Sequence, residues 1–193
     1  MNLSNKKITG KFIELKSVAI EDMPLIHLIY RDEKTTEQAR YYYQISIDKL
    51  SDIYRKRIDS SKEGCNIDFL IRKNSNREVI GVCTFKEIDF KIKTGEFGIM
   101  VHHKFWGSRA VIECFFLCFD FFYENLKLTT IKTAAFTTNR RSRALMQHLD
   151  IPLHSIKENV MVLEGEQKDD ACYMINIEQW ARIKAYLKKL LYS

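Results

Sequence analysis

The chain has 193 residues, of which 46% are hydrophobic and 29% charged, and it contains only 7 glycines and 2 prolines. This apolar content supports a buried core, so extensive disorder, collagen-like repeats and low-complexity sequence are excluded. The formal net charge of +6 permits acidic ligands such as phosphates but does not make nucleic acid the expected partner.

The N-terminal third is predicted to hold one strand and two helices. Residues 11–20 alternate in part and are rich enough in β-branched side chains for a strand. Asp22 and Pro24 mark the start of a helix that runs to Arg31. Residues 46–58 place apolar side chains on one stripe at helical spacing, which predicts a second helix.

The middle of the chain is predicted to form a meander and a crossover. Residues 66–73, 78–90 and 96–103 are β-rich and are separated by turn residues, which is typical of antiparallel strands. Residues 108–125 are apolar all round, as in a buried helix, and residues 128–136 form the next strand. Such a strand, helix and strand place the two strands parallel to each other.

The C-terminal part is predicted to contain two more helices and two strands. Asn139 caps a short helix that ends before Pro152, residues 155–165 and 171–177 are strands, and residues 178–192 form an amphipathic helix. The fold class is therefore α/β (α+β), with a mixed, mostly antiparallel sheet flanked by helices on both faces. We expect a single domain over residues 1–193.

Cysteines and apolar segments indicate the cellular setting. The odd set of Cys65, Cys83, Cys114, Cys118 and Cys172 contains no CxxC pair, which favours buried free thiols over disulfides and predicts no metal site. The N-terminus has no apolar stretch typical of a signal peptide, and residues 110–123 are too short to span a bilayer. We therefore expect a cytoplasmic protein without membrane partners.

Residues 96–114 carry the main candidate for a binding site. A strand ends near Val101, a basic and aromatic turn follows, and a helix begins near Ser108. Unpaired N–H groups at a helix start can hold a phosphate, and Gly107 lets the backbone approach a ligand. Many strand-to-helix turns with one glycine bind nothing, however, so spacing alone leaves both interpretations open.

Several motifs in this region and beyond it match one known family. Phe105, Trp106 and Gly107 match the start of its Y-W-G-x-G-x-A coenzyme A motif, and Arg109 and Val111 depart from it. Further blocks are Glu96-Phe97-Gly98, Asn139-Arg140-Arg141-Ser142, and Asp170 through Tyr173 to Trp180. On these motifs the chain resembles the GNAT superfamily of N-acyltransferases, in particular the branch of the ribosomal-protein alanine acetyltransferases RimJ and RimL.

The resemblance implies a site as well as a fold. It places acceptor-side helices at about 20–65, an acetyl-CoA-binding core at about 78–150, and C-terminal strands and a helix at 155–192. It makes Glu96 the base that accepts the amine proton and Ser142 a donor to the leaving thiolate. It assigns acetyl-CoA to Met100, Val101, Trp106, Gly107, Ser108, Arg109, Ala110, Val111, Asn139 and Ser142, with the backbone groups of Met100 and Val101 pairing with the pantetheine arm.

Each assignment has a structural alternative. Glu96 is otherwise a surface strand residue, and Ser142 a residue on a helix surface. The side chain of Arg109 either crowds the phosphate loop or points outward and adds charge. Tyr42 and His102 are candidates for substrate contact, although two neighbouring histidines without carboxylate partners are more often solvated turn residues.

The resemblance predicts a cytoplasmic N-acetyltransferase that moves the acetyl group of acetyl-CoA to a primary amine without a metal. The acceptor is either a small amine, such as an amino sugar, nucleotide sugar, polyamine or antibiotic, or a protein N-terminus. Arg31 and Arg40 in the acceptor segment suit a polar small molecule. The alternative is a non-catalytic binding module with a degenerate coenzyme A loop, and the chain is expected to be a monomer or homodimer.

Overall fold

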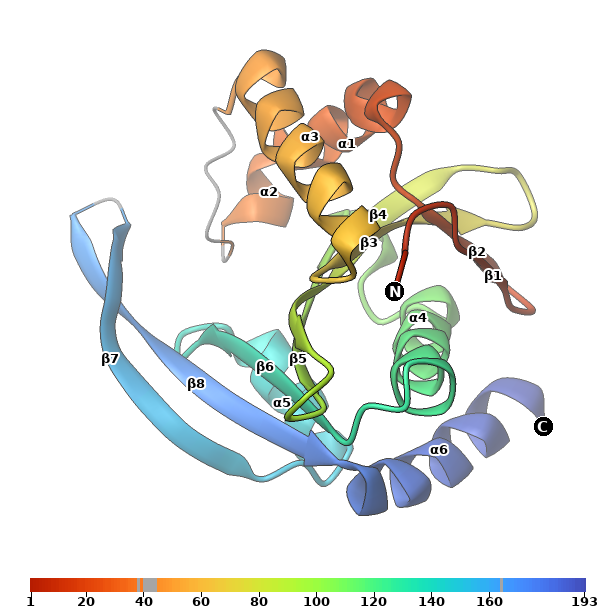
Figure 1. Ribbon diagram of the computed structural model, residues 1–193. Coiled ribbons are helices and arrows are strands. Elements are labelled where there is room, and N and C mark those ends of the chain that lie inside the picture. The colour runs from red at the N-terminus through yellow and green to blue at the C-terminus, as the bar shows by residue number, and fades with distance from the viewer. Residues whose placement is uncertain (38, 40–44, 164) are drawn as a thin grey trace.

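An eight-stranded sheet organises the molecule (Figure 1). The computed structural model describes residues 1–37, 39, 45–163 and 165–193. The strand order is β1-β2-β3-β4-β5-β6-β8-β7, and only the pair β5–β6 is parallel. The strands are β1 Lys7–Thr9, β2 Ile13–Ser17, β3 Ile67–Lys73, β4 Val79–Asp89, β5 Thr94–Val101, β6 Thr130–Phe136, β7 Leu153–Leu163 and β8 Glu166–Asn176. The predicted mixed, mostly antiparallel sheet is confirmed.

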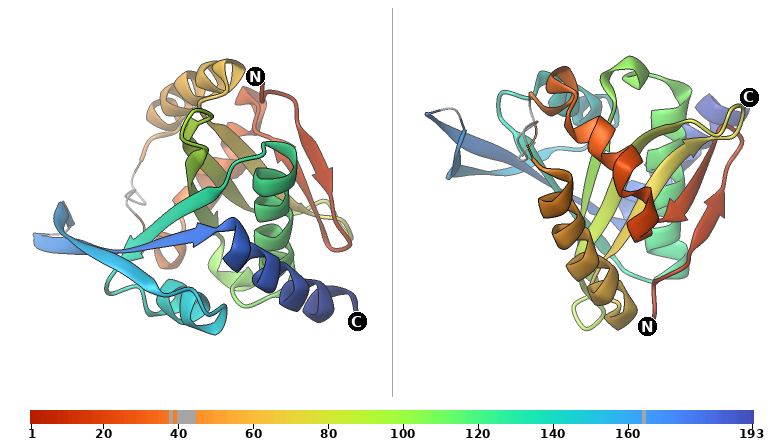
Figure 2. Two further views of the ribbon diagram at one scale, coloured as in Figure 1. Left: turned by 60° about the horizontal axis from the view of Figure 1, so that its bottom comes forward. Right: turned by 90° about the horizontal axis from the view of Figure 1, so that it is seen from above.

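Helices cover both faces of this sheet (Figure 2). They are α1 Met23–Tyr30, α2 Glu33–Thr36, α3 Ile47–Glu63, α4 Arg109–Asp120, α5 Arg140–His148 and α6 Ile177–Tyr192. Side chains of α1 and α3 pack on one face against Leu70 and Val82. Side chains of α4, α5 and α6 share the larger core on the other face with Phe69 and Ile71. Successive residues of β3 therefore point into two different cores, which explains its nearly continuous apolar sequence.

Helix α3 shows how local signals set the ends of a helix. The Oγ of Ser46 accepts from the N–H of Lys49 at 3.2 Å, and Gly64 ends the helix with a φ of +87°. This left-handed conformation favours glycine and closes the last turn. The helix therefore continues past residue 58, where the apolar stripe had suggested its end, as far as Glu63.

Strands β1 and β8 and helix α2 also differ from the sequence prediction. Strand β1 and the four-residue helix α2 were not expected, because segments this short show no measurable periodicity. Strand β8 begins at Glu166 rather than at residue 171, and its first residues pair with β7 in a hairpin that projects from the body of the molecule (Figure 2). Polar residues form this part because it packs against no core.

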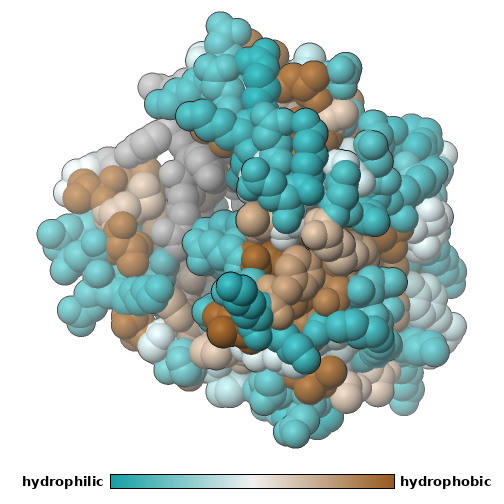
Figure 3. Space-filling model, viewed as in Figure 1, coloured by the Kyte–Doolittle hydropathy of each residue, from teal (hydrophilic) through white to brown (hydrophobic). Residues whose placement is uncertain are grey.

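The projecting hairpin carries apolar side chains on its surface. Ile156 and Val162 of β7 are 52% and 57% exposed. Brown patches lie on the hairpin in the space-filling view, whereas the surface over α3 is mostly hydrophilic (Figure 3). In the described residues, no helix has the length and apolar character needed to cross a membrane.

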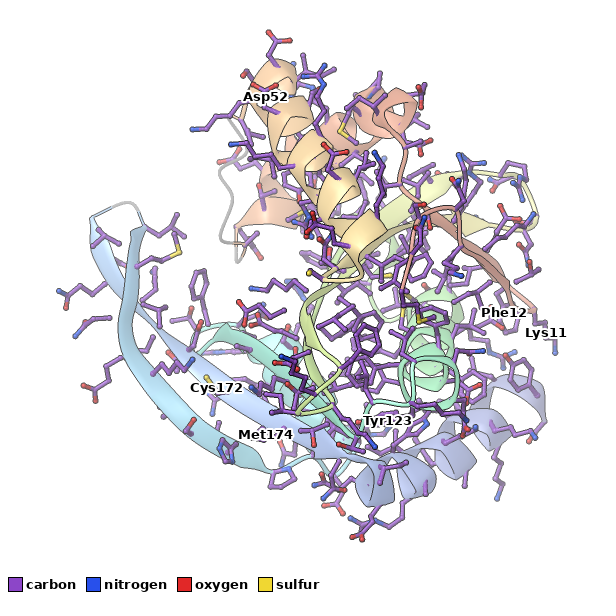
Figure 4. All side chains as sticks on the ribbon, in the orientation of Figure 1. Lys11, Phe12, Asp52, Tyr123, Cys172 and Met174 are labelled. Atoms are coloured by element: carbon purple, nitrogen blue, oxygen red, sulfur yellow. The ribbon has the colours of Figure 1, made fainter. Side chains whose placement is uncertain are left out.

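Helix α4 is followed directly by a π-helical turn, Phe121–Asn125, which completes the apolar segment predicted as one helix. Tyr123 of this turn donates its hydroxyl to the carbonyl of Ile175 at 2.6 Å and stacks on Trp180 (Figure 4). These contacts join the end of α4 to β8 and α6. They fix α4, whose other end reaches the candidate site.

Candidate active site

The site lies where strands β5 and β6 separate. The two strands are paired only at Thr94–Glu96 with Thr130–Lys132, although β5 continues to Val101 and β6 to Phe136. Beyond Glu96 the backbone groups on this edge of β5 therefore have no neighbouring strand. A fork of this kind exposes unpaired N–H and C=O groups inside a sheet, where a ligand can use them.

The register of β4 and β5 identifies the backbone groups that face the fork. His102 donates its N–H to Ile80 across the β4 side at 2.8 Å. Because an antiparallel ladder alternates, Met100 and Gly98 also direct their backbone groups to β4, whereas Ile99 and Val101 direct theirs to the fork. This corrects the expected backbone contact of Met100, whose side chain instead packs toward the core under α1 and α3.

Two adjoining cavities open at the fork. The first, of about 210 Å³, is lined by residues of β4, β5 and β6, including Glu96 and Gly98. The second, of about 490 Å³, lies between the start of α4 and α5. Ile99, Met100, Asn139 and Ser142 line both. Ser108, Arg109 and Ala110 line neither cavity, whereas the other predicted site residues in the described part of the chain, apart from His102, line one or both: Glu96, Met100, Val101, Trp106, Gly107, Val111, Asn139 and Ser142.

The loop between β5 and α4 borders the larger cavity. Gly107 has a φ of +73° and open space where a side chain would begin. Arg109 begins α4 with an exposed side chain outside the lining, whereas Gly107 and Val111 belong to it. The Oγ of Ser108 is buried and has no hydrogen-bond partner in the described part of the chain, so the contact of Ser108 with acetyl-CoA stays a prediction.

Helix α5 forms the opposite wall of the larger cavity. The Oδ1 of Asn139 accepts from the N–H of Ser142 at 3.1 Å, which confirms the predicted cap. Arg141 stacks on Trp106, with its guanidinium carbon 3.4 Å from the ring centroid, and its Nη2 lies 3.4 Å from Glu37. The loop, α5 and the end of α2 therefore meet over this cavity.

The smaller cavity contains both charge signs. The Oε1 of Glu96 lies 2.8 Å from the Nζ of Lys86, the residue directly opposite it on β4. The Glu96 side chain is 27% exposed. Arg57 of α3 also lines this cavity. Arg57 is not among the residues that the sequence predicted for the site, although one signal was present. With Leu50 and Tyr54 it continues the buried stripe of α3, where a charged residue is unexpected.

The two histidines after β5 have a carboxylate partner, contrary to expectation. The Nδ1 of His103 lies 2.7 Å from Asp32 and the Nε2 of His102 lies 3.8 Å from it. Burial raises the pKa of Asp32, but hydrogen bonds from Thr35 and His103 outweigh it and hold the pKa at about 2. Burial lowers the pKa of His102. His102 borders neither of the two cavities, so its position gives no support to a substrate contact.

Two groups of side chains are close enough to share a metal ion among the described residues. One is Asp32 with His102 and His103, and the other is the trio Cys83, Cys114 and Cys118. The trio is fully buried between β4 and α4, with the Sγ of Cys118 3.3 Å from Cys83 and 3.9 Å from Cys114. Neither group lines either of the two cavities. Cys65, which was expected to be buried like the other cysteines, is exposed.

The predicted substrate contact of Tyr42 lies outside the described residues.

Strand β8 extends the sheet beyond β6, on the side of the fork away from β5. Cys172 of β8 is opposite Ala134 of β6, and Met174 is opposite Lys132 (Figure 4). The open face beside Glu96 thus continues from β5 and β6 onto β8.

Comparison with known proteins identifies the family. Residues 13–151 match the family described as the acetyltransferase (GNAT) domain. Because this match covers most of the chain, the chain belongs to the GNAT acetyltransferase family, as the sequence motifs predicted. By class it is an acetyl-CoA-dependent N-acetyltransferase. Among curated proteins, no relative matches the chain.

Solved structures share the fold over nearly the whole chain. A protein from T. thermophilus described as an acetyltransferase has a TM-score of 0.83 and 21% identity, covering 100% of both chains. RimL, the ribosomal L7/L12 alpha-N-protein acetyltransferase in complex with coenzyme A, has a TM-score of 0.80 and 17% identity. This match covers 90% of the present chain and 99% of RimL. Vibrio cholerae spermidine N-acetyltransferase, in complex with CoA and spermine, has a TM-score of 0.77 and 16% identity. This match covers 88% of the present chain and 98% of that enzyme.

Proposed function

We propose that this protein transfers an acetyl group from acetyl-CoA to a primary amine by direct attack of the amine on the thioester. The observation that carries the proposal is the fork between β5 and β6, where a cavity beside the start of α4 adjoins a second cavity that contains Glu96. A donor and an acceptor bound in the two cavities meet beside Gly98, whose missing side chain leaves open space. Such positioning supplies much of the rate when the acyl group is already activated.

The residues around the larger cavity fit coenzyme A. The fork-facing backbone groups of Ile99 and Val101 suit the amides of its pantetheine arm, although the Val101 carbonyl also accepts from the Trp106 indole at 2.8 Å. The N–H groups of Arg109 and Ala110 in the first turn of α4 suit its pyrophosphate. Coenzyme A supplies an acetyl group activated as a thioester. Asn139 and Ser142 border its reactive end in this proposal.

On the acceptor side, Glu96 takes up the proton that the amine must lose. A bond forms between the amine nitrogen and the acyl carbon, and the bond from that carbon to sulfur breaks. The proton of the attacking nitrogen passes to Glu96 directly or through a water, and Ser142 donates a hydrogen bond to the departing sulfur. The ammonium group of Lys86 beside Glu96 holds the carboxylate in place at the cavity wall.

Binding of acetyl-CoA is the direct test of this proposal. At 100 times its dissociation constant, the ligand is expected to stabilise the folded protein by about 2.7 kcal/mol, which a thermal-shift assay measures as a rise in Tm. Thiol release with a panel of amines and N-terminal peptides then measures turnover. Absence of any shift at millimolar acetyl-CoA would support the alternative, a non-catalytic module with a degenerate coenzyme A loop.

Arg109, which stands where the family has glycine, is expected to be dispensable. Because its side chain is exposed and outside the cavity lining, Arg109→Gly should change the free energy of unfolding by less than about 1 kcal/mol and leave the Kd for acetyl-CoA unchanged. Calorimetry with acetyl-CoA measures the Kd of the parent protein and of each variant. Gly107→Val is the matched contrast: its positive φ disfavours a side chain, so binding should weaken. A tenfold loss of affinity in Arg109→Gly contradicts the prediction.

A further inference from the structure

The guanidinium group of Arg57 is held rigidly at the floor of the smaller cavity. Its Nε donates to the Oδ2 of Asp68 at 2.9 Å, and its Nη2 donates to the Oγ1 of Thr84 at 2.8 Å and to the Oδ1 of Asp68. Thr84 in turn donates to the Oδ1 of Asp68 at 2.5 Å. An arginine fixed in this way loses little side-chain freedom when it binds a further anion.

One nitrogen of this guanidinium remains for a ligand. The hydrogen bonds that the guanidinium makes with described residues use Nε and Nη2, which leaves Nη1. The side chain of Arg57 is 21% exposed and lines the cavity that contains Glu96, whereas Asp68 is 4% exposed and lies outside the lining. The cavity therefore presents the cation and hides its counterion.

The sheet register places this cation close to the proposed point of reaction. Thr84, which Arg57 contacts, is directly opposite Gly98 on β5, and Lys86 is opposite Glu96. Gly98 and Glu96 lie on the same face of β5, roughly 6.6 Å apart along the strand. A molecule whose amine approaches Glu96 therefore reaches Arg57 with a group only a few bonds away.

The charges of the cavity disfavour a polycation. Among the described residues, its charged lining consists of Arg57, Lys86 and Glu96, and the single carboxylate already has Lys86 as its partner. A polyamine would bring further positive charges to a wall that offers them no free carboxylate. An anion on the acceptor would instead form charge-assisted hydrogen bonds with a preorganised guanidinium.

We infer, on the basis of the acetyltransferase function proposed above, that the acceptor is a small amine with a carboxylate or phosphate a few bonds from its amino group, and that Arg57 binds this anion. Arg57 is thus a specificity-determining residue. A purely structural role, in which it only ties α3 to β3 and β4, predicts no effect on the choice of acceptor.

Matched pairs of amines test the inference. Propylamine is compared with β-alanine for the carboxylate, ethanolamine with O-phosphoethanolamine for the phosphate, and spermidine represents the polycations. Thiol release gives kcat/KM, and calorimetry on the CoA-loaded protein gives binding even without turnover. At least one anionic amine is expected to exceed its neutral partner by about tenfold or more, as for a charge-assisted hydrogen bond. Equal values within both pairs, or preference for spermidine, overturn the inference.

Arg57→Lys keeps the charge but removes the planar fork that contacts Asp68 and Thr84. It should abolish most of the tenfold preference for the anionic amine, while Arg55→Lys, an exposed position on the same helix, should leave that preference intact. If Arg57→Lys does not fold, Arg57→Gln with Asp68→Asn removes both charges together. A preference that survives these changes overturns the role of Arg57. Failure of the acetyltransferase function itself appears separately, as absent acetyl-CoA binding.

Discussion

Replacing Glu113 by alanine is expected to lower the free energy of unfolding by about 3–5 kcal/mol, the largest effect on stability that we predict for one side chain. Glu113 lies in α4 and is completely buried. Its two oxygens accept from the N–H groups of Lys11, Phe12 and Ile13 at 2.7, 2.7 and 2.9 Å. Alanine would leave these three N–H groups, of which that of Ile13 is buried, without this acceptor.

The same carboxyl group joins three distant parts of the chain. Lys11 and Phe12 form the β1–β2 turn, which lies beside the C-terminal end of α6 (Figure 4). From that helix, Tyr192 donates its hydroxyl to the Oε1 of Glu113 at 2.9 Å. Burial and the neighbouring Glu113 raise the pKa of Tyr192. Loss of Glu113 should therefore loosen both chain ends against α4.

Equilibrium denaturation measures this effect, and two variants sharpen it. Tyr192→Phe removes only one of the four hydrogen bonds and should cost about 1–2 kcal/mol. Gly10→Ala should also destabilise the protein, because its added Cβ would lie 2.5 Å from the Cδ of Glu113. A Glu113→Ala protein as stable as the parent would show that the turn finds other partners.

Glu113 also illustrates what the sequence could not predict. Its spacing placed it within a segment that is apolar all round, and its hydrogen-bond partners lie about 100 residues earlier in the chain. Periodicity reports which face of a helix is buried, but it carries no information on a contact between residues so far apart. The same limit hid Arg57, whose position on the apolar stripe of α3 was visible but whose partner Asp68 lies on another element.

The elements that were predicted correctly have strong local signals. Asn139 gave the start of α5, because an N-cap is encoded in the residues that it caps. The parallel pairing of β5 and β6 followed from the strand, helix and strand around α4. The projecting part of β8 was missed for the opposite reason, since a hairpin that packs against no core has no alternation of polar and apolar residues to detect.

For the candidate site, motif order predicted which segments meet, and the structure adds which groups they present. Glu96, Gly107, Asn139 and Ser142 do line the two cavities at the fork. The direction of backbone groups depends on the pairing register with β4, which single-sequence patterns do not fix. For that reason the sequence suggested the backbone of Met100, whereas the ladder turns Ile99 and Val101 toward the fork.

Glu96→Gln is expected to have the largest effect on turnover, lowering kcat by about 100-fold or more while leaving the Kd for acetyl-CoA unchanged. Glutamine keeps the size of the side chain but accepts no proton, so the attacking amine loses its base. Glu87→Gln is the matched control. Glu87 follows Lys86 on β4, its side chain is exposed, and it lies outside both cavities. Thiol release measures kcat, and calorimetry measures binding.

A second variant separates proton transfer from positioning in this experiment. Lys86→Gln removes the partner 2.8 Å from the Oε1 of Glu96 but retains the carboxylate, so its loss of kcat should be smaller than that of Glu96→Gln. Unchanged turnover in Glu96→Gln would remove Glu96 from the mechanism and leave the amine to lose its proton to water.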